Sequence, residues 1–148
     1  MSNPDDVILA LEEQVHCYRR LAMLAELQHE HVQHSRVEEL LDVLGKRQSV
    51  LDDIARLEGV VSPSKRRWNE YVNEIGDGDR ARAEASLAET RRLLEEITAA
   101  DRNDALVLQQ RKLNLGRQIH QASAAKQINR NYAAAAYGPR ASRMDVQR

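Results

Sequence analysis

Thirty-seven consecutive residues, from Asp79 to Leu115, contain neither glycine nor proline. The segment is rich in Ala, Leu, Arg, Glu and Gln, which are strong helix formers. A single helix of this length extends about 55 Å at ~1.5 Å per residue. Such a rod is longer than the diameter of an ordinary globule of 148 residues. The segment therefore predicts a long helix that packs along other helices and presents faces suited to binding another protein, more than an enclosed catalytic pocket.

The composition favours a single helical domain and gives no indication of a membrane or nucleic-acid partner. One Trp, four Tyr and no Phe leave the core to Leu, Val, Ile and Ala. The formal net charge is −1, so overall charge gives no electrostatic case for binding nucleic acid. No apolar run approaches the ~20 residues of a membrane span, and the polar N-terminus does not resemble a signal peptide. With one cysteine, Cys17, an internal disulfide is excluded, so we expect a cytoplasmic protein.

The first helix is predicted to begin near Pro4, with Ser2 or Asn3 as its N-cap. Its apolar residues recur at alternating spacings of three and four, which is the pattern of a coiled-coil seam. Additional leucines widen the stripe, so this helix is expected to cover more than one neighbour. The seam consists of Ile8, Leu11, Val15, Tyr18, Ala22, Ala25, His29 and Val32.

A second helix is predicted from about Arg36, because Ser35 and Glu38 have the spacing of a capping box. Arg47 and Gln48 fall where the apolar stripe would continue, which predicts a polar layer in the seam. Gly59 and the segment 62–64, Ser-Pro-Ser, are expected to end the helix. The predicted stripe consists of Val37, Leu40, Leu41, Leu44, Leu51, Ile54 and Leu57.

The remaining chain predicts a short third helix around Trp68 and Tyr71, a turn over residues 76–79, and the long helix to about Ile128. A break over residues 101–104 is possible, but we favour one bent helix. Its first half places Ala83, Leu87, Leu94 and Ile97 on a core face. The predicted fold is all-α: an elongated antiparallel helical bundle or coiled coil of three to four helices over residues 1–128, with a long C-terminal helix and a mobile tail over 129–148.

Three histidines, His29, His31 and His34, lie within six residues and suggest a metal site. Two Glu-x-x-His pairs also occur, Glu13 with His16 and Glu26 with His29. Di-iron bundles place such pairs on different helices, whereas both pairs here fall on one helix. We therefore favour a polar helix end with solvated histidines, and keep a ferritin-like metal-binding bundle as an alternative.

The motifs of catalytic sites are missing from the sequence. Cys17 lies on a mainly apolar helix, and the neighbouring His16 projects roughly 100° away around that helix, so a catalytic thiol is not indicated. The sequence has no glycine-rich phosphate loop and no nucleophile elbow. We expect no enzymatic activity, no cofactor, and no catalytic or metal-binding residues.

The C-terminal third has more apolar residues than a two-layer bundle can cover. Leu106, Leu108 and Leu113, with the apolar residues after them, are spread over several faces of the predicted helix. Either a wide core face, self-association or a partner helix would bury them. A structural coiled-coil dimer is therefore a second alternative.

The arrangement resembles the FlgN family of flagellar export chaperones. The best match covers residues 38–58: a Glu-Leu-Leu from Glu39, the sequence Gly-Lys-Arg-Gln from Gly45, and then leucines at helical spacing ending in Leu57-Glu58. The leading helix, Asn103 before Leu106, and the Tyr-Gly-Pro sequence from Tyr137 are also similar to the family. The resemblance extends over most of the chain, while the histidine cluster and residues 76–79 depart from it.

The resemblance implies a non-enzymatic cytoplasmic chaperone. It would bind hook–filament junction proteins (FlgK/FlgL-like) and deliver them to the flagellar type III export apparatus. In the family the C-terminal region contacts the substrate, which corresponds here to the segment from Leu106 to Tyr137. The expected partner-binding residues are Leu106, Leu108, Leu113, Leu115, Ile119, Ile128, Tyr132 and Tyr137.

Overall fold

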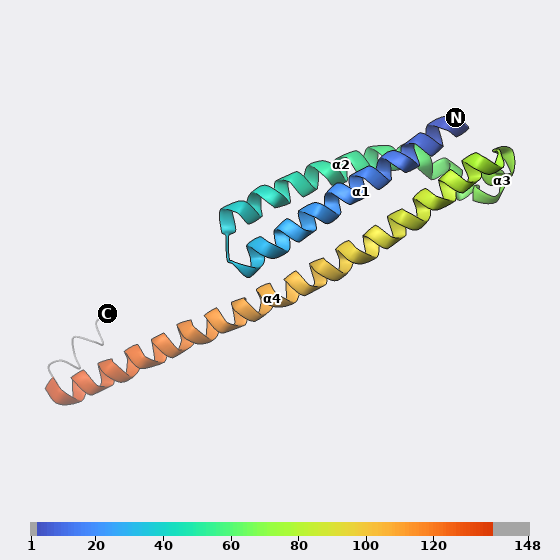
Figure 1. The fold of residues 1–148 in the computed structure, drawn as a ribbon. Coiled ribbons are helices and arrows are strands. Elements are labelled where there is room, and N and C mark those ends of the chain that lie inside the picture. The colour runs from blue at the N-terminus through green and yellow to red at the C-terminus, as the bar shows by residue number, and fades with distance from the viewer. Residues whose placement is uncertain (1–2, 138–148) are drawn as a thin grey trace. The chain divides into compact units, whose positions relative to one another are not determined.

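The computed structural model describes residues 3–137, with side chains to residue 133, and every element in this range is an α-helix. Four helices follow one another along the chain (Figure 1). The all-helical prediction is confirmed. The chain divides into two compact units between Val107 and Leu108. The helices are α1 (Pro4–Gln33), α2 (Val37–Arg66), α3 (Trp68–Glu74) and α4 (Asp77–Tyr137).

Helix α1 begins as predicted and is buried on more than one side. The side chain of Asn3 caps it, because its Oδ1 accepts a hydrogen bond from the backbone amide of Asp5 at 3.2 Å. Pro4 occupies the first turn, where its missing amide hydrogen costs nothing. The wide buried surface is consistent with contacts to two other helices. Its buried residues are Val7, Ile8, Ala10, Leu11, Gln14, Val15, Cys17, Leu21, Ala25, Gln28 and Val32.

The turn between α1 and α2 differs from the predicted capping box. Ser35 has a φ of 53°, in the left-handed region, and closes α1. The amide of Arg36 donates to the carbonyl of His31 at 2.9 Å, and the amide of Ser35 donates to that of Val32 at 3.3 Å. Arg36 is the N-cap of α2 and no side chain caps it. The capping-box prediction was wrong because Ser35 ends one helix and does not begin the next.

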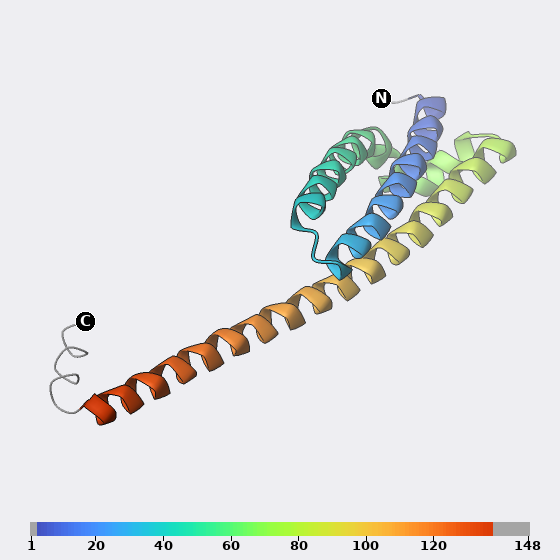
Figure 2. The same ribbon diagram turned by 60° about the vertical axis from the view of Figure 1, so that its left-hand side comes forward.

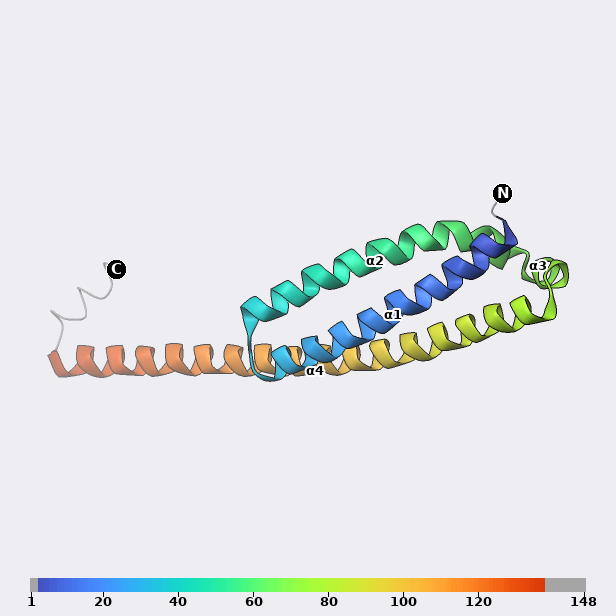
Figure 3. The same cartoon turned by 45° about the horizontal axis from the view of Figure 1, so that its top comes forward.

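The first unit brings α1 against both α2 and the first part of α4. Contacts between α1 and α2 run in opposite order along the two helices: Gln14 contacts Glu58, whereas Gln28 contacts Arg47. Contacts between α1 and α4 run in the same order: Glu12 contacts Arg82, and Gln28, further along α1, contacts Asp104, further along α4. In Figures 2 and 3, α1 lies between α2 and the α4 segment of this unit.

Helix α2 buries a different stripe from the one predicted. Its buried residues recur at spacings of seven, four, three and four, and Arg47 lies in the gap of seven. Ile54 and Leu57 were predicted correctly, but Val37, Leu41, Leu44 and Leu51 are exposed. Two apolar stripes lie side by side on this helix, and periodicity alone does not decide between them. The buried residues are Val43, Val50, Ile54, Leu57 and Val61.

Helix α2 also continues beyond its predicted end. It passes through Gly59 and Pro63 to Arg66. Proline removes one backbone hydrogen bond from a helix. Because Pro63 lies within a turn of the C-terminus, the missing bond falls at the end of the helix and does not stop it earlier. The prediction that Gly59 and residues 62–64 end this helix was therefore wrong.

The short helix α3 closes one end of the first unit. Its residues Tyr71 and Val72 are buried, and the short helix itself was predicted. The Tyr71 hydroxyl donates to the carbonyl of Pro4 at 3.1 Å, which joins α3 to the beginning of α1. The rings of Trp68 and Tyr71 pack with centroids 5.3 Å apart.

Helix α4 is continuous from Asp77 to Tyr137, including residues 101–104. It begins at Asp77, inside the segment 76–79 that was predicted to be a turn. In the first unit it buries Leu93 in place of the predicted Leu94, which is exposed. The helix also continues past Ile128, where we expected it to end. Four alanines before Tyr137 explain the extension, because alanine has the highest helix propensity. The rest of the predicted tail lies outside the described residues.

Candidate partner-binding surface

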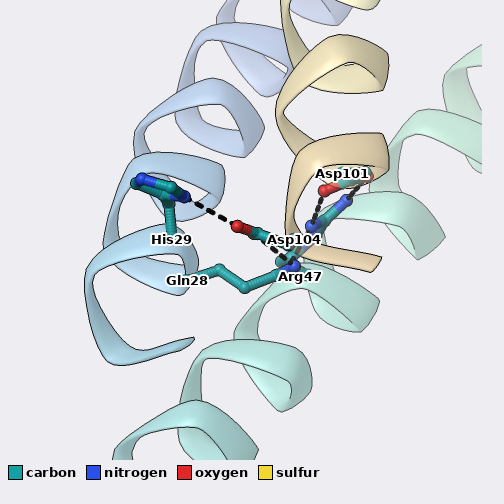
Figure 4. A network of polar contacts seen from close by, with 5 residues as sticks. All are labelled: Gln28, His29, Arg47, Asp101 and Asp104. Atoms are coloured by element: carbon teal, nitrogen blue, oxygen red, sulfur yellow. Dashed lines mark hydrogen bonds and ion pairs between the residues drawn. The ribbon is translucent and has the colours of Figure 1, made fainter. Parts of the chain in front are cut away.

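A polar layer interrupts the apolar packing of the first unit where α1, α2 and α4 meet (Figure 4). Gln28 belongs to the buried stripe of α1, Arg47 falls between Val43 and Val50 of α2, and Asp104 belongs to α4. Gln28 is 8% exposed and Asp104 is 1% exposed. Three polar side chains, one from each helix, therefore occupy seam positions at the same height along the helix axes.

The geometry of this layer satisfies its buried carboxylate. Asp104 Oδ2 accepts from Gln28 Nε2 at 3.2 Å, and Asp104 Oδ1 lies 2.7 Å from His29 Nδ1. An ionised carboxylate only accepts hydrogen bonds, so the Nδ1 atom of His29 is the donor. Arg47 donates to both oxygens of Asp101, at 2.7 and 2.8 Å, and also to Gln28 Oε1. The hydrogen bond to Asp101 raises the pKa of Arg47, so Arg47 stays charged.

The polar layer is best explained as a determinant of helix register. In coiled coils, polar side chains at seam positions select one alignment of the helices at some cost in stability. Here a shift of α1 or α4 by one turn would separate Asp104 from Gln28, and a shift of α2 would separate Arg47 from Asp101. Either shift would leave buried polar atoms without partners. The predicted polar layer is confirmed for Arg47. Gln48 is exposed and donates to Asp52 on its own helix.

The histidine cluster does not converge on one point. His29 contacts Asp104, whereas the Nδ1 atom of His31 is buried without a hydrogen-bond partner. His34 is exposed at the end of α1. Among the residues that the structure describes, no group of three or more His, Cys, Asp or Glu side chains is placed to hold a metal ion. The metal-binding alternative gains no support from this arrangement.

Cys17 is buried within α1 and is a free thiol. Burial raises the pKa of its thiol. A thiol reacts as its thiolate, so a raised pKa makes the side chain less nucleophilic. The environment of Cys17 thus favours a packing role.

The buried seam of α4 ends where the first unit ends. In that unit the seam runs through Ala83, Leu93, Ile97 and Asp104. Continued at spacings of three and four beyond Val107, the same pattern falls on polar residues. The continued positions are Arg111, Asn114, Gln118 and Gln121. The apolar seam is therefore interrupted over residues 111–121, and the same spacing meets apolar residues again at Ala125 and Ile128.

The predicted partner-binding residues with described side chains are all exposed. Leu106 belongs to the first unit and is 67% exposed. The six in the second unit are between 44% and 80% exposed. Tyr137 lies in α4, and its side chain is outside the described residues. The residues of the second unit are Leu108, Leu113, Leu115, Ile119, Ile128 and Tyr132.

These apolar side chains fall on two opposite faces of one helix. At about 100° per residue, Leu108, Leu115 and Ile119 lie within roughly 40° of one another. Leu113 and Ile128 lie on the opposite side of the helix by the same geometry. We define the first of these faces, with Leu108, Leu115 and Ile119 as its apolar residues, as the C-terminal face. A helix with this much exposed apolar surface is suited to burial against a partner.

The second property of this region is its basic character, which the net charge of the whole chain does not show. After Asp104, the next acidic residue in the sequence is Asp145. Residues 105–137 contain five Lys and Arg residues and no Asp or Glu. The five are Arg111, Lys112, Arg117, Lys126 and Arg130. Counting charge by segment would have revealed this basic helix, which the net charge of −1 hides.

Comparison with known proteins gives no relative: no protein-family model, curated protein or solved structure matches this chain. In the part of the chain that the structure describes, none of the helices has the length and apolar character needed to cross a membrane.

Proposed function

We propose that this protein is a cytoplasmic chaperone of the FlgN type. It would bind hook–filament junction proteins (FlgK/FlgL-like) and deliver them to the flagellar type III export apparatus. The observation that carries this proposal is the exposed apolar surface of α4 from Leu108 to Tyr132. A chaperone for export must hold an otherwise insoluble segment, and an amphipathic helix of the substrate can lay its apolar stripe along such a surface.

The energy available from this surface is adequate for specific binding. Fully burying one Leu or Ile side chain contributes about 1.5–3 kcal/mol. Leu108, Leu115 and Ile119 together offer about 5–9 kcal/mol before the costs of association and ordering are subtracted. Those costs cancel a large share of this binding free energy. The final affinity therefore depends on how much of the partner must become ordered and on contacts outside these three residues.

The proposal includes an antiparallel helical bundle as the architecture of the first unit. The opposite order of the contacts between α1 and α2 supports this arrangement. The segment that resembles the FlgN family lies in α2. Ile54 and Leu57 of that segment are core residues, whereas Leu51 is exposed. Packing in the core therefore explains the spacing of two of these three apolar residues.

Co-expression with the FlgK- and FlgL-like proteins of the same genome tests the proposal. The test variant is Leu108→Ser/Leu115→Ser/Ile119→Ser, on the C-terminal face. The matched control is Leu41→Ser/Leu44→Ser on α2, because those leucines have comparable exposure. We expect the wild-type chain and the control to co-purify with a junction protein and the test variant to lose it. No co-purification with either protein, or equal retention by the test variant, contradicts the proposal.

A structural coiled-coil dimer is a second candidate, favoured by the exposed stripe of α2. Val37, Leu41, Leu44 and Leu51 are spaced by four, three and seven residues and are all at least 41% exposed. This spacing is that of a seam without a partner in the described structure. Light scattering of the wild-type chain and of Leu41→Lys/Leu44→Lys tests it. A stable dimer that the variant converts to monomer supports this candidate, and a wild-type monomer rejects it.

A further inference from the structure

The C-terminal face contains lysines among its apolar residues. Continued at spacings of three and four from Leu108, it passes through Lys112, Leu115 and Ile119 and reaches Lys126. Both lysines are exposed, as are the apolar residues beside them. Because 112 and 126 are separated by two heptads, they occupy equivalent positions in the seam. Arg130 follows four residues later on the same side of the helix.

We propose that the segment bound by this face is an acidic amphipathic helix of a partner protein. Its apolar seam would contain two carboxylate side chains about 14 residues apart, opposite Lys112 and Lys126. This inference rests on the proposed function, since it specifies the chemistry of the segment that the same surface takes. A charged residue at a seam position selects a partner of opposite charge there.

The charge pattern argues against a second copy of this helix as the occupant. Paired in parallel and in register, each lysine faces its own counterpart. Paired antiparallel, each lysine faces the other type of seam position, where Leu108 and Leu115 lie, so its charge is buried without a carboxylate partner. Residues 105–137 contain no Asp or Glu that would pair with these lysines in either arrangement. Like charges opposed in a seam disfavour the pair, so the complementary partner is a different, acidic segment.

The apolar pattern argues against a membrane surface or a nucleic acid. A helix that lies in a membrane interface concentrates its apolar residues on one face and its cations on the other. Here Leu113 and Ile128 lie opposite the C-terminal face, and the lysines lie within that face. Nucleic-acid binding relies on phosphate contacts and base stacking. Tyr132 is the one aromatic side chain described in the second unit, and phosphate contacts would leave the leucines exposed.

Two synthetic helical peptides provide a direct test with the full-length chain. Both have the same apolar heptad residues, and they differ at two seam positions 14 residues apart, which are Glu in one peptide and Lys in the other. Fluorescence anisotropy measures their binding in low and high salt. We expect the Glu peptide to bind about tenfold or more tightly than the Lys peptide, with the difference shrinking at high salt.

A charge-swapped variant makes the test specific to the C-terminal face. Lys112→Glu/Lys126→Glu is expected to reverse the preference, so that the Lys peptide binds more tightly. The matched control, Arg117→Glu/His120→Glu, places two carboxylates on the opposite side and is expected to keep the wild-type preference. Circular dichroism of each variant verifies that its helix content is unchanged. Equal binding of the two peptides, no binding of either, or no reversal by the swap overturns the inference.

Competition distinguishes a protein segment from other polyanions. A single-stranded RNA of 20 nucleotides, and vesicles containing phosphatidylglycerol, are added at the same concentration of negative charge as the Glu peptide. We expect neither to displace the peptide. Displacement by either overturns the inference in favour of that polyanion. Co-purification of junction proteins tests the proposed function separately. A failure there with the peptide preference intact rejects the function but not the acidic-segment inference.

Discussion

Removing the buried carboxylate of Asp104 is expected to destabilise the first unit by about 2 kcal/mol. Asp104→Ala leaves Gln28 Nε2, which is buried with its residue 8% exposed, without an acceptor. An unsatisfied buried donor costs about 1–3 kcal/mol. The His29 side chain is 42% exposed, so water replaces its lost partner and the loss is about 0.5–1 kcal/mol. Relief of the desolvation cost of a buried charge offsets part of the sum.

Urea denaturation followed by circular dichroism measures this change. With about 2 kcal/mol lost from a unit of this size, the midpoint of thermal unfolding should also fall by roughly 10 °C. Asn103→Ala is the matched control, because Asn103 is exposed on the same turn of α4. It is expected to change the free energy of unfolding by less than about 0.5 kcal/mol. Equal stability of the two variants would refute the account of the polar layer.

Three further outcomes follow from the fold. Ser35→Gly should stabilise the chain by about 0.5–1 kcal/mol in urea denaturation, because glycine adopts a φ of 53° without a Cβ clash. The control Ser49→Gly lies inside α2, where glycine is unfavourable, and should destabilise the chain by a similar amount. Cys17, whose pKa is raised by burial, should react with a disulfide reagent more slowly in the native protein than in guanidinium. Equal rates would contradict its burial. A chain ending after Val107 should unfold cooperatively, whereas one ending after Asn103 lacks the carboxylate of the polar layer and should be measurably less stable.

The positions of helices could be predicted from local signals. Asn3 and Pro4 located the start of α1, and the absence of Gly and Pro from Asp79 to Leu115 located the long helix. The polar layer was visible because Arg47 interrupts an apolar pattern. These features depend on residues close in sequence, which is why they can be read without the fold.

The choice of buried face could not be predicted for α2. Leu44 and Val43 are neighbours in sequence on adjacent stripes, and packing against α1 buries the valine. The role of Ser35 was predicted wrongly for a related reason: a serine at a helix boundary can end one helix or cap the next. The partner of Arg47 was equally hidden, since Asp101 comes next to it only when α2 and α4 pack together.

The structure shows that the C-terminal apolar residues are exposed. It does not contain the partner that would cover them, so the partner is a proposal. The sequence showed more apolar residues than a two-layer bundle covers, and the structure places Leu108, Leu115 and Ile119 in solvent. Charge by segment was the signal that sequence reasoning overlooked. Residues 105–137 contain five Lys and Arg residues and no Asp or Glu. This composition indicates an acidic partner, which the net charge of the whole chain does not.

Hydrogen exchange of the free chain and of its complex with a junction protein tests the central claim most directly. An isolated exposed helix is marginally stable, so the amides of residues 108–133 should exchange fast in the free chain. In the complex, the account predicts strong protection of this same segment and little change in α1 and α2. Protection confined to the first unit, with residues 108–133 still exchanging fast, would contradict the assignment of the binding surface.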